Sequence, residues 1–115
     1  MENEKVYAMS LAKIYSCLLT KAARKGRTEA EVKEIIEWLT GYSPNETEQL
    51  VQDDISYGDF FRNAPRMNPR RKLITGSICG IKLDSIKDPL MQDMRYLDKL
   101  IDELARGKSL EKIKR

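Results

Sequence analysis

Apolar residues recur every three or four positions along most of this chain, the spacing of one face of an α-helix. The clearest case begins after Ser10, which is a suitable N-terminal cap. Its apolar positions are Leu11, Ile14, Tyr15, Leu18, Leu19 and Ala22. Gly26 follows where a chain can leave a helix through a left-handed conformation. The pattern therefore predicts a helix that starts at residue 11 and ends before Gly26.

Two further helices are predicted to begin at a capping box, in which a hydroxyl accepts from a backbone N–H of the first turn and a glutamate reaches back. Thr28 and Glu31 form the first box, and Gly41 ends that helix. Its apolar positions are Val32, Ile35, Ile36 and Leu39. The same start recurs at Ser43 with proline at the first helical position, and we expect a short helix to about Val51.

The longest predicted helix begins at Asp88 and Pro89 and ends at Gly107, which leaves residues 108–115 as an extra turn and a frayed tail. Its apolar positions step by four and three, the heptad seam of a coiled coil, and two more widen the seam. These positions are Leu90, Met94, Leu97, Ile101 and Leu104, with Met91 and Leu100 beside them. They form one broad core-facing stripe in the first interpretation. In the second they are interface candidates, and the protein is a homodimer.

The segment between these helices has two interpretations. Asn68 and Pro69 can open a helix that Gly80 closes, and we favour this one. Gly76 inside that helix costs about 1 kcal/mol relative to alanine and would mark a close helix crossing in the core. Alternatively, residues 73–83 form a short β-hairpin. The residues that favour a hairpin are Ile78, Ile81 and Leu83, with two glycines among them.

One more short helix completes the predicted fold. Ser56 and Asp59 can cap one or two turns, which Pro65 stops. The aromatic residues of those turns are Tyr57, Phe60 and Phe61. Together the patterns predict an all-α protein, a compact bundle of five to six helices with the hairpin as its alternative β element. At 115 residues, the chain is expected to fold as a single domain over residues 1–115.

Composition narrows the environment of the protein. The net charge of +3 is mild and does not by itself indicate nucleic acid. The sequence has no apolar run of about 20 residues and no signal-like start, so we expect a cytoplasmic protein without a membrane segment. Cys17 and Cys79 have apolar neighbours, which favours buried, reduced thiols.

The absence of histidine removes most ordinary catalytic chemistry. It excludes Ser–His and Cys–His pairs and imidazole metal ligands, and two cysteines alone cannot complete a structural zinc site. Two carboxylate pairs could in principle hold a hard cation, but solvated helix surface explains them better. They are Asp53 with Asp54 and Asp98 with Asp102. We therefore predict no enzyme, no catalytic residue, no metal and no cofactor.

Two motif fragments imitate catalytic or phosphate-binding loops. The run "RGKSL" at 106–110 contains Gly-Lys-Ser, but Asp102 stands where a phosphate loop needs its first glycine, and a helix precedes it. In "GSICG" at 76–80 the serine is at the wrong position for a nucleophile turn, and no histidine could activate it. We expect its Ser77 and Cys79 to be small residues at a packing contact.

The sharpest candidate site is a basic stretch. Residues 60–83 contain six cations and no carboxylate. A helix start at 68–69 would bring backbone N–H groups and guanidinium groups together, as in many phosphate sites. The anion-binding candidates are Arg62, Arg66, Asn68, Arg70, Arg71 and Lys72. We favour the alternative, in which these cations pair with acidic surface of the same chain or of a second subunit, notably Glu29, Glu31, Glu34 and Glu37.

A second basic cluster lies at the end of the first predicted helix. Its members are Lys21, Arg24, Lys25 and Arg27. Cations are favoured there by the helix dipole in any protein, so we give this cluster little functional weight.

Several longer blocks resemble a known family. They include "KAARKGRTEAEV", "EWLTGYS", "DISYGDFFRNAP" and "NPRRKLITGSICGIKLDSIKDPLMQDMRYLDKLIDELARGK", and the likeness runs from Lys5 to Ile113. The chain resembles the bacterial proteins grouped as domain-of-unknown-function family 2200. That resemblance implies a small, mainly helical, stand-alone cytoplasmic protein, and it supplies neither an activity nor catalytic residues.

Two functional hypotheses follow. The leading one is a non-catalytic helical module that binds protein, chiefly itself, through apolar helix surface that includes residues 89–106. The alternative is an anion or nucleic-acid binder that uses residues 62–72, with nucleic acid the less favoured partner. An enzyme ranks third, and a deep pocket that gathers tyrosine, lysine and carboxylate groups would revive it.

Overall fold

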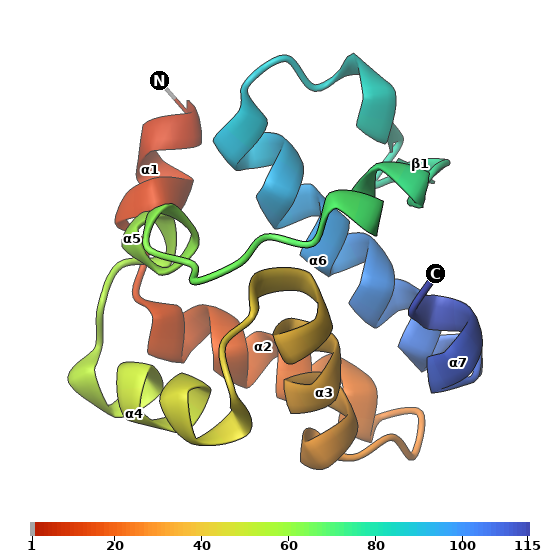
Figure 1. Ribbon diagram of the computed structural model, residues 1–115, viewed down its shortest axis with the longest axis horizontal. Helices are drawn as coiled ribbons and strands as arrows, with labels where there is room; N and C mark the ends of the chain where they lie inside the picture. The colour runs from red at the N-terminus through yellow and green to blue at the C-terminus, as the bar shows by residue number, and fades with distance from the viewer. Residues whose placement is uncertain (1) are drawn as a thin grey trace.

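The structure is a computed structural model that describes residues 2–115, and helices make up most of it (Figure 1). Seven α-helices, two short 3₁₀ helices and a two-stranded antiparallel sheet follow one another along this part of the chain. The α-helices are α1 (Glu2–Ala8), α2 (Leu11–Ala23), α3 (Glu29–Thr40), α4 (Pro44–Asp53), α5 (Tyr57–Arg62), α6 (Pro89–Ala105) and α7 (Leu110–Ile113). The other elements are η1 (Pro69–Leu73), β1 (Ser77–Ile78), β2 (Ile81–Lys82) and η2 (Leu83–Ser85). The mainly α fold with a short hairpin confirms the predicted fold class.

The predicted caps form at the starts of the helices. Ser10 Oγ accepts from Lys13 N at 3.3 Å at the start of α2. Both halves of the capping box of α3 are present, and so are both halves of the box that opens α4. Helix α4 continues to Asp53, two residues beyond the predicted end. Because each cap lies within three residues of the N–H group that it satisfies, local sequence was sufficient to locate these starts.

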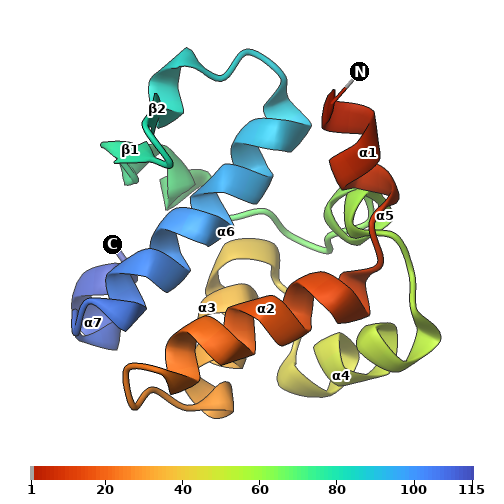
Figure 2. The same cartoon turned by 180° about the vertical axis from the view of Figure 1, so that it is seen from behind.

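The core lies where α2, α3 and α6 pack against one another (Figure 2). From α2 and α3 the buried apolar side chains are Leu11, Tyr15, Leu18, Ala22, Val32, Ile35, Ile36 and Leu39. From α6 they are Met91, Met94, Tyr96, Leu97, Leu100, Ile101 and Leu104. Six of the seven interface candidates are thus buried inside the chain, and Leu90 is half-buried against the same core. Helix α6 therefore presents a broad core-facing stripe, and its seam offers no free apolar surface to a partner.

Residues 69–83 differ from the favoured prediction of a helix closed by Gly80. Only the 3₁₀ helix η1 forms there, and a hairpin follows in which Ser77 pairs with Lys82 and Ile78 with Ile81. Gly76, Cys79 and Gly80 have φ values of 96°, 52° and 79°. Cys79 and Gly80 are the two central residues of the turn. Positive φ at both of them is typical of a type I′ hairpin turn and incompatible with a right-handed helix. The helix prediction is therefore wrong, and the hairpin alternative is confirmed.

The small residues of this hairpin do not lie at a packing contact. Ser77 and Cys79 are exposed, and the nearest neighbours of a Cβ on Gly76 would be side-chain atoms of Lys99 at 3.5 and 3.6 Å. Gly76 serves the turn, not a helix crossing. Cys17 is also exposed, on the outer face of α2, and both thiols are free. The prediction of buried thiols is wrong because apolar sequence neighbours do not determine which side of a helix or turn a residue occupies.

The two ends of the chain are more ordered than the sequence indicated. Helix α1, which no cap or apolar period predicted, packs beside α5, and its Tyr7 Oη donates to Asp88 Oδ2 at 2.5 Å. At the other end, Ile113 is fully buried and Arg115 Nη2 lies 2.7 Å from Glu103 Oε2. The predicted frayed tail is therefore docked onto α6. None of the described helices has the length and apolar character needed to cross a membrane.

Candidate functional site

Two of the five cations of the basic stretch 62–72 are paired with carboxylates in the described part of the molecule. Arg62 pairs with Asp59 at 2.9 Å, and Arg71 Nε lies 2.9 Å from Asp93 Oδ1. Lys72 Nζ donates to the side-chain oxygen of Gln92 at 3.0 Å. Contacts with α5 and α6 thus engage three of the five cations and neutralise two of them, so the favoured salt-bridge interpretation holds for part of the stretch.

The acidic partners are not those expected on α3. Glu29 pairs with Lys33, Glu31 with Arg27 and Glu34 with Lys114. None of these three ion pairs involves residues 62–72. The prediction of the partners is wrong because the basic stretch crosses α3 only at its C-terminal end.

Asn68 has a structural role in place of the predicted anion-binding role. Its Nδ2 donates to the carbonyl oxygen of Trp38 at 3.0 Å, and its Oδ1 accepts from Arg70 N at 2.9 Å. Its own backbone N–H donates to Leu39 O at 2.9 Å, and Arg66 N donates to Thr40 O at 3.0 Å. This segment therefore caps the carbonyl end of α3 and starts η1, so the first N–H groups of η1 are not free for an anion.

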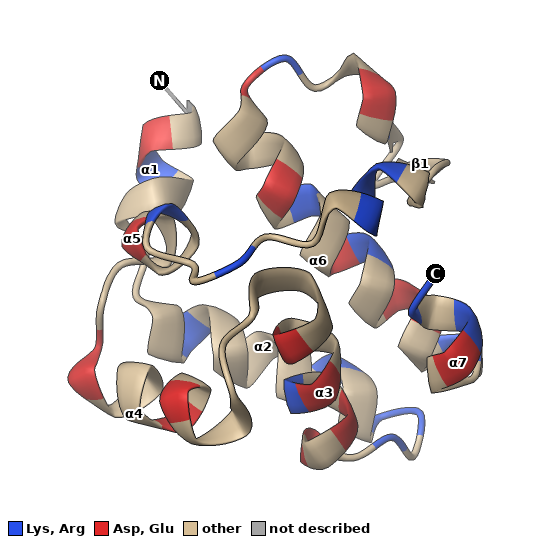
Figure 3. Cartoon of the chain, viewed as in Figure 1, with Lys and Arg blue, Asp and Glu red and all other residues tan. Residues whose placement is uncertain are grey.

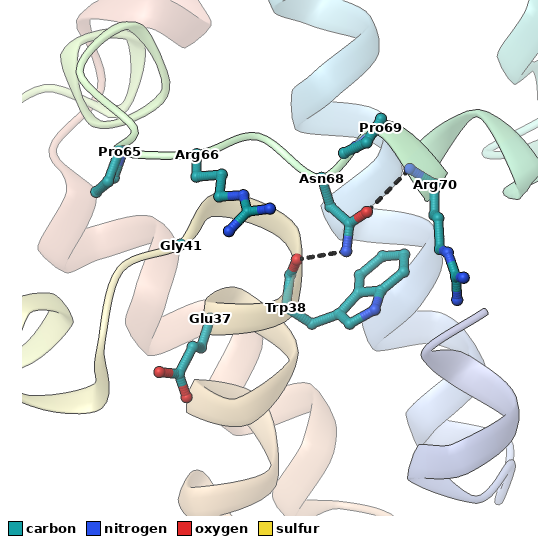
Figure 4. Close-up of a pocket in the computed structure, with 8 residues that line it drawn as sticks. All are labelled: Glu37, Trp38, Gly41, Pro65, Arg66, Asn68, Pro69 and Arg70. Atoms are coloured by element: carbon teal, nitrogen blue, oxygen red, sulfur yellow. Dashed lines mark hydrogen bonds between the residues drawn. The ribbon is translucent and has the colours of Figure 1, made fainter.

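The remaining two candidates, Arg66 and Arg70, border a groove of about 780 Å³. The groove is lined by Glu37, Trp38, Gly41, Pro65, Arg66, Asn68, Pro69 and Arg70. Figure 4 shows the indole of Trp38 between the two guanidinium groups. Both arginines are exposed, and neither pairs with a carboxylate among the side chains that the structure describes. We call this feature the Trp38 groove.

A larger concentration of cations lies at another place, which we call the basic end. Two adjoining hollows, of about 600 and about 670 Å³, share Asp102, Arg106 and Gly107. Their cationic lining residues are Lys21, Arg24, Lys25, Lys99, Arg106, Lys108 and Lys112, and their carboxylates are Asp102 and Glu103. Figure 2 shows that the C-terminal ends of α2 and α6 meet beside α7, and Figure 3 shows the cationic connection that follows α2.

The two carboxylates of the basic end are already engaged by cations. Asp102 lies 3.3 Å from Lys21 and 2.9 Å from Arg106. Glu103 is buried and pairs with Arg115 at 2.7 Å and with Lys108 at 3.5 Å. Arg24, Lys25 and Lys112 pair with no carboxylate in the part of the chain that the structure describes. Seven cations against two carboxylates leave an excess of five positive charges on this surface.

Burial perturbs the pKa of two side chains outside these two surfaces. Burial raises the pKa of Asp98, whose carboxylate pairs with Arg95 at 3.0 Å. Burial also raises the pKa of the Tyr57 phenol well above its usual value. The described residues contain no group of three or more side chains that could hold a metal ion. What the described surface offers chemically is charge and one half-buried indole.

Sequence reasoning identified part of this surface and discounted it. The dipole of one helix explains the positions of Lys21, Arg24 and Lys25 in the sequence, and the run RGKSL, which contains Arg106 and Lys108, does not match a phosphate loop. The signal for the basic end in the sequence is the group of cations that follows the longest predicted helix, after residue 105. Their convergence with the end of α2 depends on long-range packing, which no local pattern reports.

The fold and this surface define a small, mainly helical protein with a cationic end, and comparison with known proteins places it in a family. The chain belongs to DUF2200, described as an uncharacterized protein conserved in bacteria, whose model matches residues 5–115. It is also similar to a solved structure, the crystal structure of uncharacterized protein SP1917. The two are 44% identical, with a TM-score of 0.92, over 96% of this chain and 90% of that one. No curated protein matches the chain.

Proposed function

We propose that this protein is a non-catalytic nucleic-acid-binding module and that the basic end is its main contact surface. The observation that carries the proposal is the excess of five positive charges on two adjoining hollows. The net charge of the whole chain is only +3, so the remainder of the molecule carries a net charge of −2. An uneven distribution of this kind attracts a phosphate backbone to one face.

Helix dipoles alone do not account for so much charge. The C-terminal ends of α2 and α6 each present the equivalent of roughly −0.5 charge, about −1 together. This partial negative charge is much smaller than the excess of five positive charges at the basic end. The surplus cations therefore repel one another in the free protein, and a polyanion that spreads over both hollows would relieve that repulsion.

An extended ligand fits this surface better than a small anion. The cations come from α2 and the connection after it, and from α6 and the segment after it. They line two open hollows, not one enclosed pocket. Lys21, Arg24 and Lys25 are exposed, as is Arg106. A phosphate backbone presents charges at regular intervals and can meet such a dispersed set, whereas a single phosphate contacts only two or three of them.

Neither of the other functional hypotheses gains support from a specific observation. The heptad seam of α6 is buried, so self-association through that helix has no surface to use. Homodimerisation through another face stays a prediction, which light scattering after gel filtration would test. The non-catalytic part of the proposal rests on the lack of histidine in the sequence.

The proposal is tested by fluorescence anisotropy with labelled oligonucleotides, single-stranded and duplex, at about 50 mM and about 200 mM salt. The double variant R24E/K25E reverses two basic-end cations that have no acidic partner in the described part of the chain. The control K13E/K87E changes the net charge equally, with Lys13 at the start of α2 and Lys87 before α6. We expect R24E/K25E to weaken binding about tenfold or more at low salt and the control to change it much less. Absence of binding at low salt, or equal losses in both variants, would refute the proposal.

A further inference from the structure

We infer that the nucleic acid bound by this protein is single-stranded and that one unpaired base stacks on Trp38 in the Trp38 groove. This inference rests on the proposed function and names the class of ligand. Three observations carry it: the presentation of the indole, the two arginines beside it, and the contacts that join the groove to the basic end.

Trp38 is a firmly held aromatic surface. It lies in the last turn of α3, half-buried, with one part of its ring system packed against the core and the rest in the groove. Its carbonyl oxygen accepts from Asn68 Nδ2 at 3.0 Å, which ties the backbone of this turn to the segment before η1. An aromatic side chain held in this way can receive a base without much loss of its own conformational freedom.

The two arginines supply charge on either side of the indole. Arg66 makes no ion pair with a described residue, and Arg70 Nη1 donates to the main-chain oxygen of Arg115 at 3.1 Å. Their remaining N–H donors face solvent, where they could bind the phosphates that flank a stacked base. Glu37 is the one carboxylate among the lining residues, so the groove keeps one net positive charge.

A chain of direct contacts joins the Trp38 groove to the basic end. Arg70 contacts Arg115, Arg115 pairs with Glu103 at 2.7 Å, and Glu103 pairs with Lys108 at 3.5 Å. Glu103 and Lys108 line one hollow of the basic end. These contacts place Arg115 between the Trp38 groove and the basic end, so a strand bound near Lys108 lies close to the groove.

The indole decides between single-stranded and duplex ligands. In a duplex each base is covered on both faces by its neighbours, so none can stack on a side chain without being unpaired. In a single strand every base has an accessible face, and stacking on an aromatic side chain is largely independent of sequence. A groove with an indole between two guanidinium groups is therefore suited to an unpaired base, while the basic end supplies affinity for the backbone.

Trp38 is the single tryptophan of the sequence, so its intrinsic fluorescence reports directly on the groove. We would titrate the protein with a single-stranded oligothymidylate, with a duplex of equal length and with polyglutamate, and follow Trp38 emission and, separately, anisotropy of the labelled ligand. We expect the single strand to quench Trp38 strongly and the duplex to quench it little. The variant W38A should weaken single-strand binding by about 5- to 150-fold and leave duplex binding nearly unchanged. R66Q/R70Q, which keeps the indole, should weaken single-strand binding about tenfold and reduce quenching at a given concentration.

The outcomes separate the inference from the proposed function. If oligonucleotides bind in a manner that depends on Arg24 and Lys25 but Trp38 is not quenched and W38A binds normally, the inference is wrong and the proposed function stands. If no oligonucleotide binds at low salt, both fail. Quenching by polyglutamate together with none by oligothymidylate would assign the groove to an acidic protein segment and would also overturn the inference. Circular dichroism of each variant shows whether it is folded. If W38A does not fold, R66Q/R70Q still tests the groove, because it keeps the indole.

Discussion

Gly41 illustrates, at the scale of single residues, how one position can serve both the fold and the groove. It ends α3 with a φ of 85°, and a Cβ there would lie 3.0 Å from Arg66 N and 3.1 Å from Arg66 Cβ. Gly26 has a comparable φ of 75°, but nothing lies within 4 Å of its Cβ position. A side chain at Gly26 would therefore meet backbone strain alone, whereas a side chain at Gly41 would meet the same strain and a steric contact with the segment that caps α3.

The first prediction concerns these two glycines. Gly26→Ala should lower the free energy of unfolding by about 1 kcal/mol, the cost of a left-handed conformation for a residue with a Cβ. Gly41→Ala should lower it by about 2–4 kcal/mol, because Arg66 must also move. Urea denaturation followed by circular dichroism measures both. Equal losses would show that the contact between Gly41 and Arg66 adds nothing to the strain.

Glu31 gives a prediction for pH. Arg27 and the backbone N–H of Thr28 hydrogen-bond the Glu31 carboxylate and lower its pKa from 4.5 to about 2. A pKa that is lower in the folded state means that the stabilisation is complete above pH 4.5 and is lost as the pH falls towards 2. Glu31→Gln keeps a side chain that can reach the cap but removes the charge. It should therefore reduce stability at pH 6 and flatten the dependence of stability on pH between about 4.5 and 2.

The control for this pH prediction lies in the second capping box. Glu46→Gln makes the same change at the start of α4, where no arginine among the described residues pairs with the carboxylate. Urea midpoints measured for both variants and the unsubstituted protein at pH 3, 4, 5 and 6 give the comparison. Should Glu31→Gln retain the full loss of stability below pH 4.5, the pairing of Glu31 with Arg27 is not its cause.

Single residues also mark a limit of prediction from sequence. Asn68 has the composition and position of an anion ligand next to a helix start, yet all of its polar groups serve α3 and η1. Its partner Trp38 is 30 residues away in sequence. Local pattern correctly assigned Asn68 to the start of a helical turn, but the competing long-range acceptor becomes visible only when the two segments are placed together.

Elements were predictable from sequence where a start signal and an apolar period agreed. Helices α2, α3, α5 and α6 were located within about two residues, because a cap and the face behind it are both encoded within one helix. The hairpin was assigned the lower rank because Asn68, Pro69 and Gly80 have the spacing of helix ends. Whether Gly80 ends a helix or forms a turn depends on its φ and on that of Cys79, which composition does not determine.

The heptad seam of α6 provides a prediction at the scale of one element. Leu97 is buried among α2, α3 and α6, so Leu97→Ala should lower the free energy of unfolding by about 2–5 kcal/mol through the cavity that it leaves. Leu90 belongs to the same seam but is half-buried, and Leu90→Ala should cost about half as much or less. Urea denaturation at two protein concentrations that differ tenfold measures both effects.

Protein concentration distinguishes a core from an interface. If the seam belongs to the core of one chain, the unfolding midpoints of both variants and of the unsubstituted protein are independent of concentration. A midpoint that rises with concentration and loses that dependence in Leu97→Ala would instead assign the seam to a dimer. The sequence alone could not decide this, because the same heptad spacing satisfies a core helix and a coiled coil over only two heptads.

The distribution of charge belongs to the scale of the whole molecule. Lys21, Arg24 and Lys25 are separated in sequence by about 80 residues from Arg106 and Lys108, and the packing of α2 on α6 brings them to one surface. Conversely, the six cations of 60–83 form one block in sequence, but in the fold Arg62 pairs with Asp59 on α5 and Arg71 pairs with Asp93 on α6. The sequence therefore has its densest group of cations at 62–72, whereas the folded structure has its largest excess of cations at the basic end.

Salt dependence tests that distribution as a property of the entire surface. Each phosphate neutralised on a single strand contributes about −0.7 to the slope of log K against log salt concentration. If the ligand neutralises the excess of five charges at the basic end, the slope should lie near −3.5, and it should approach −5 if Arg66 and Arg70 also engage phosphates. R66Q/R70Q removes two cations and should make the slope shallower by about 1.4. R24E/K25E also adds two carboxylates, which lowers the excess by four charges, and should make the slope shallower by about 2.8. The control K13E/K87E should lower affinity slightly while leaving the slope unchanged, since its lysines attract the strand from a distance without contacting it.

A slope near zero for the unsubstituted protein, or the same slope in all three variants, would mean that any binding is not made by these cations.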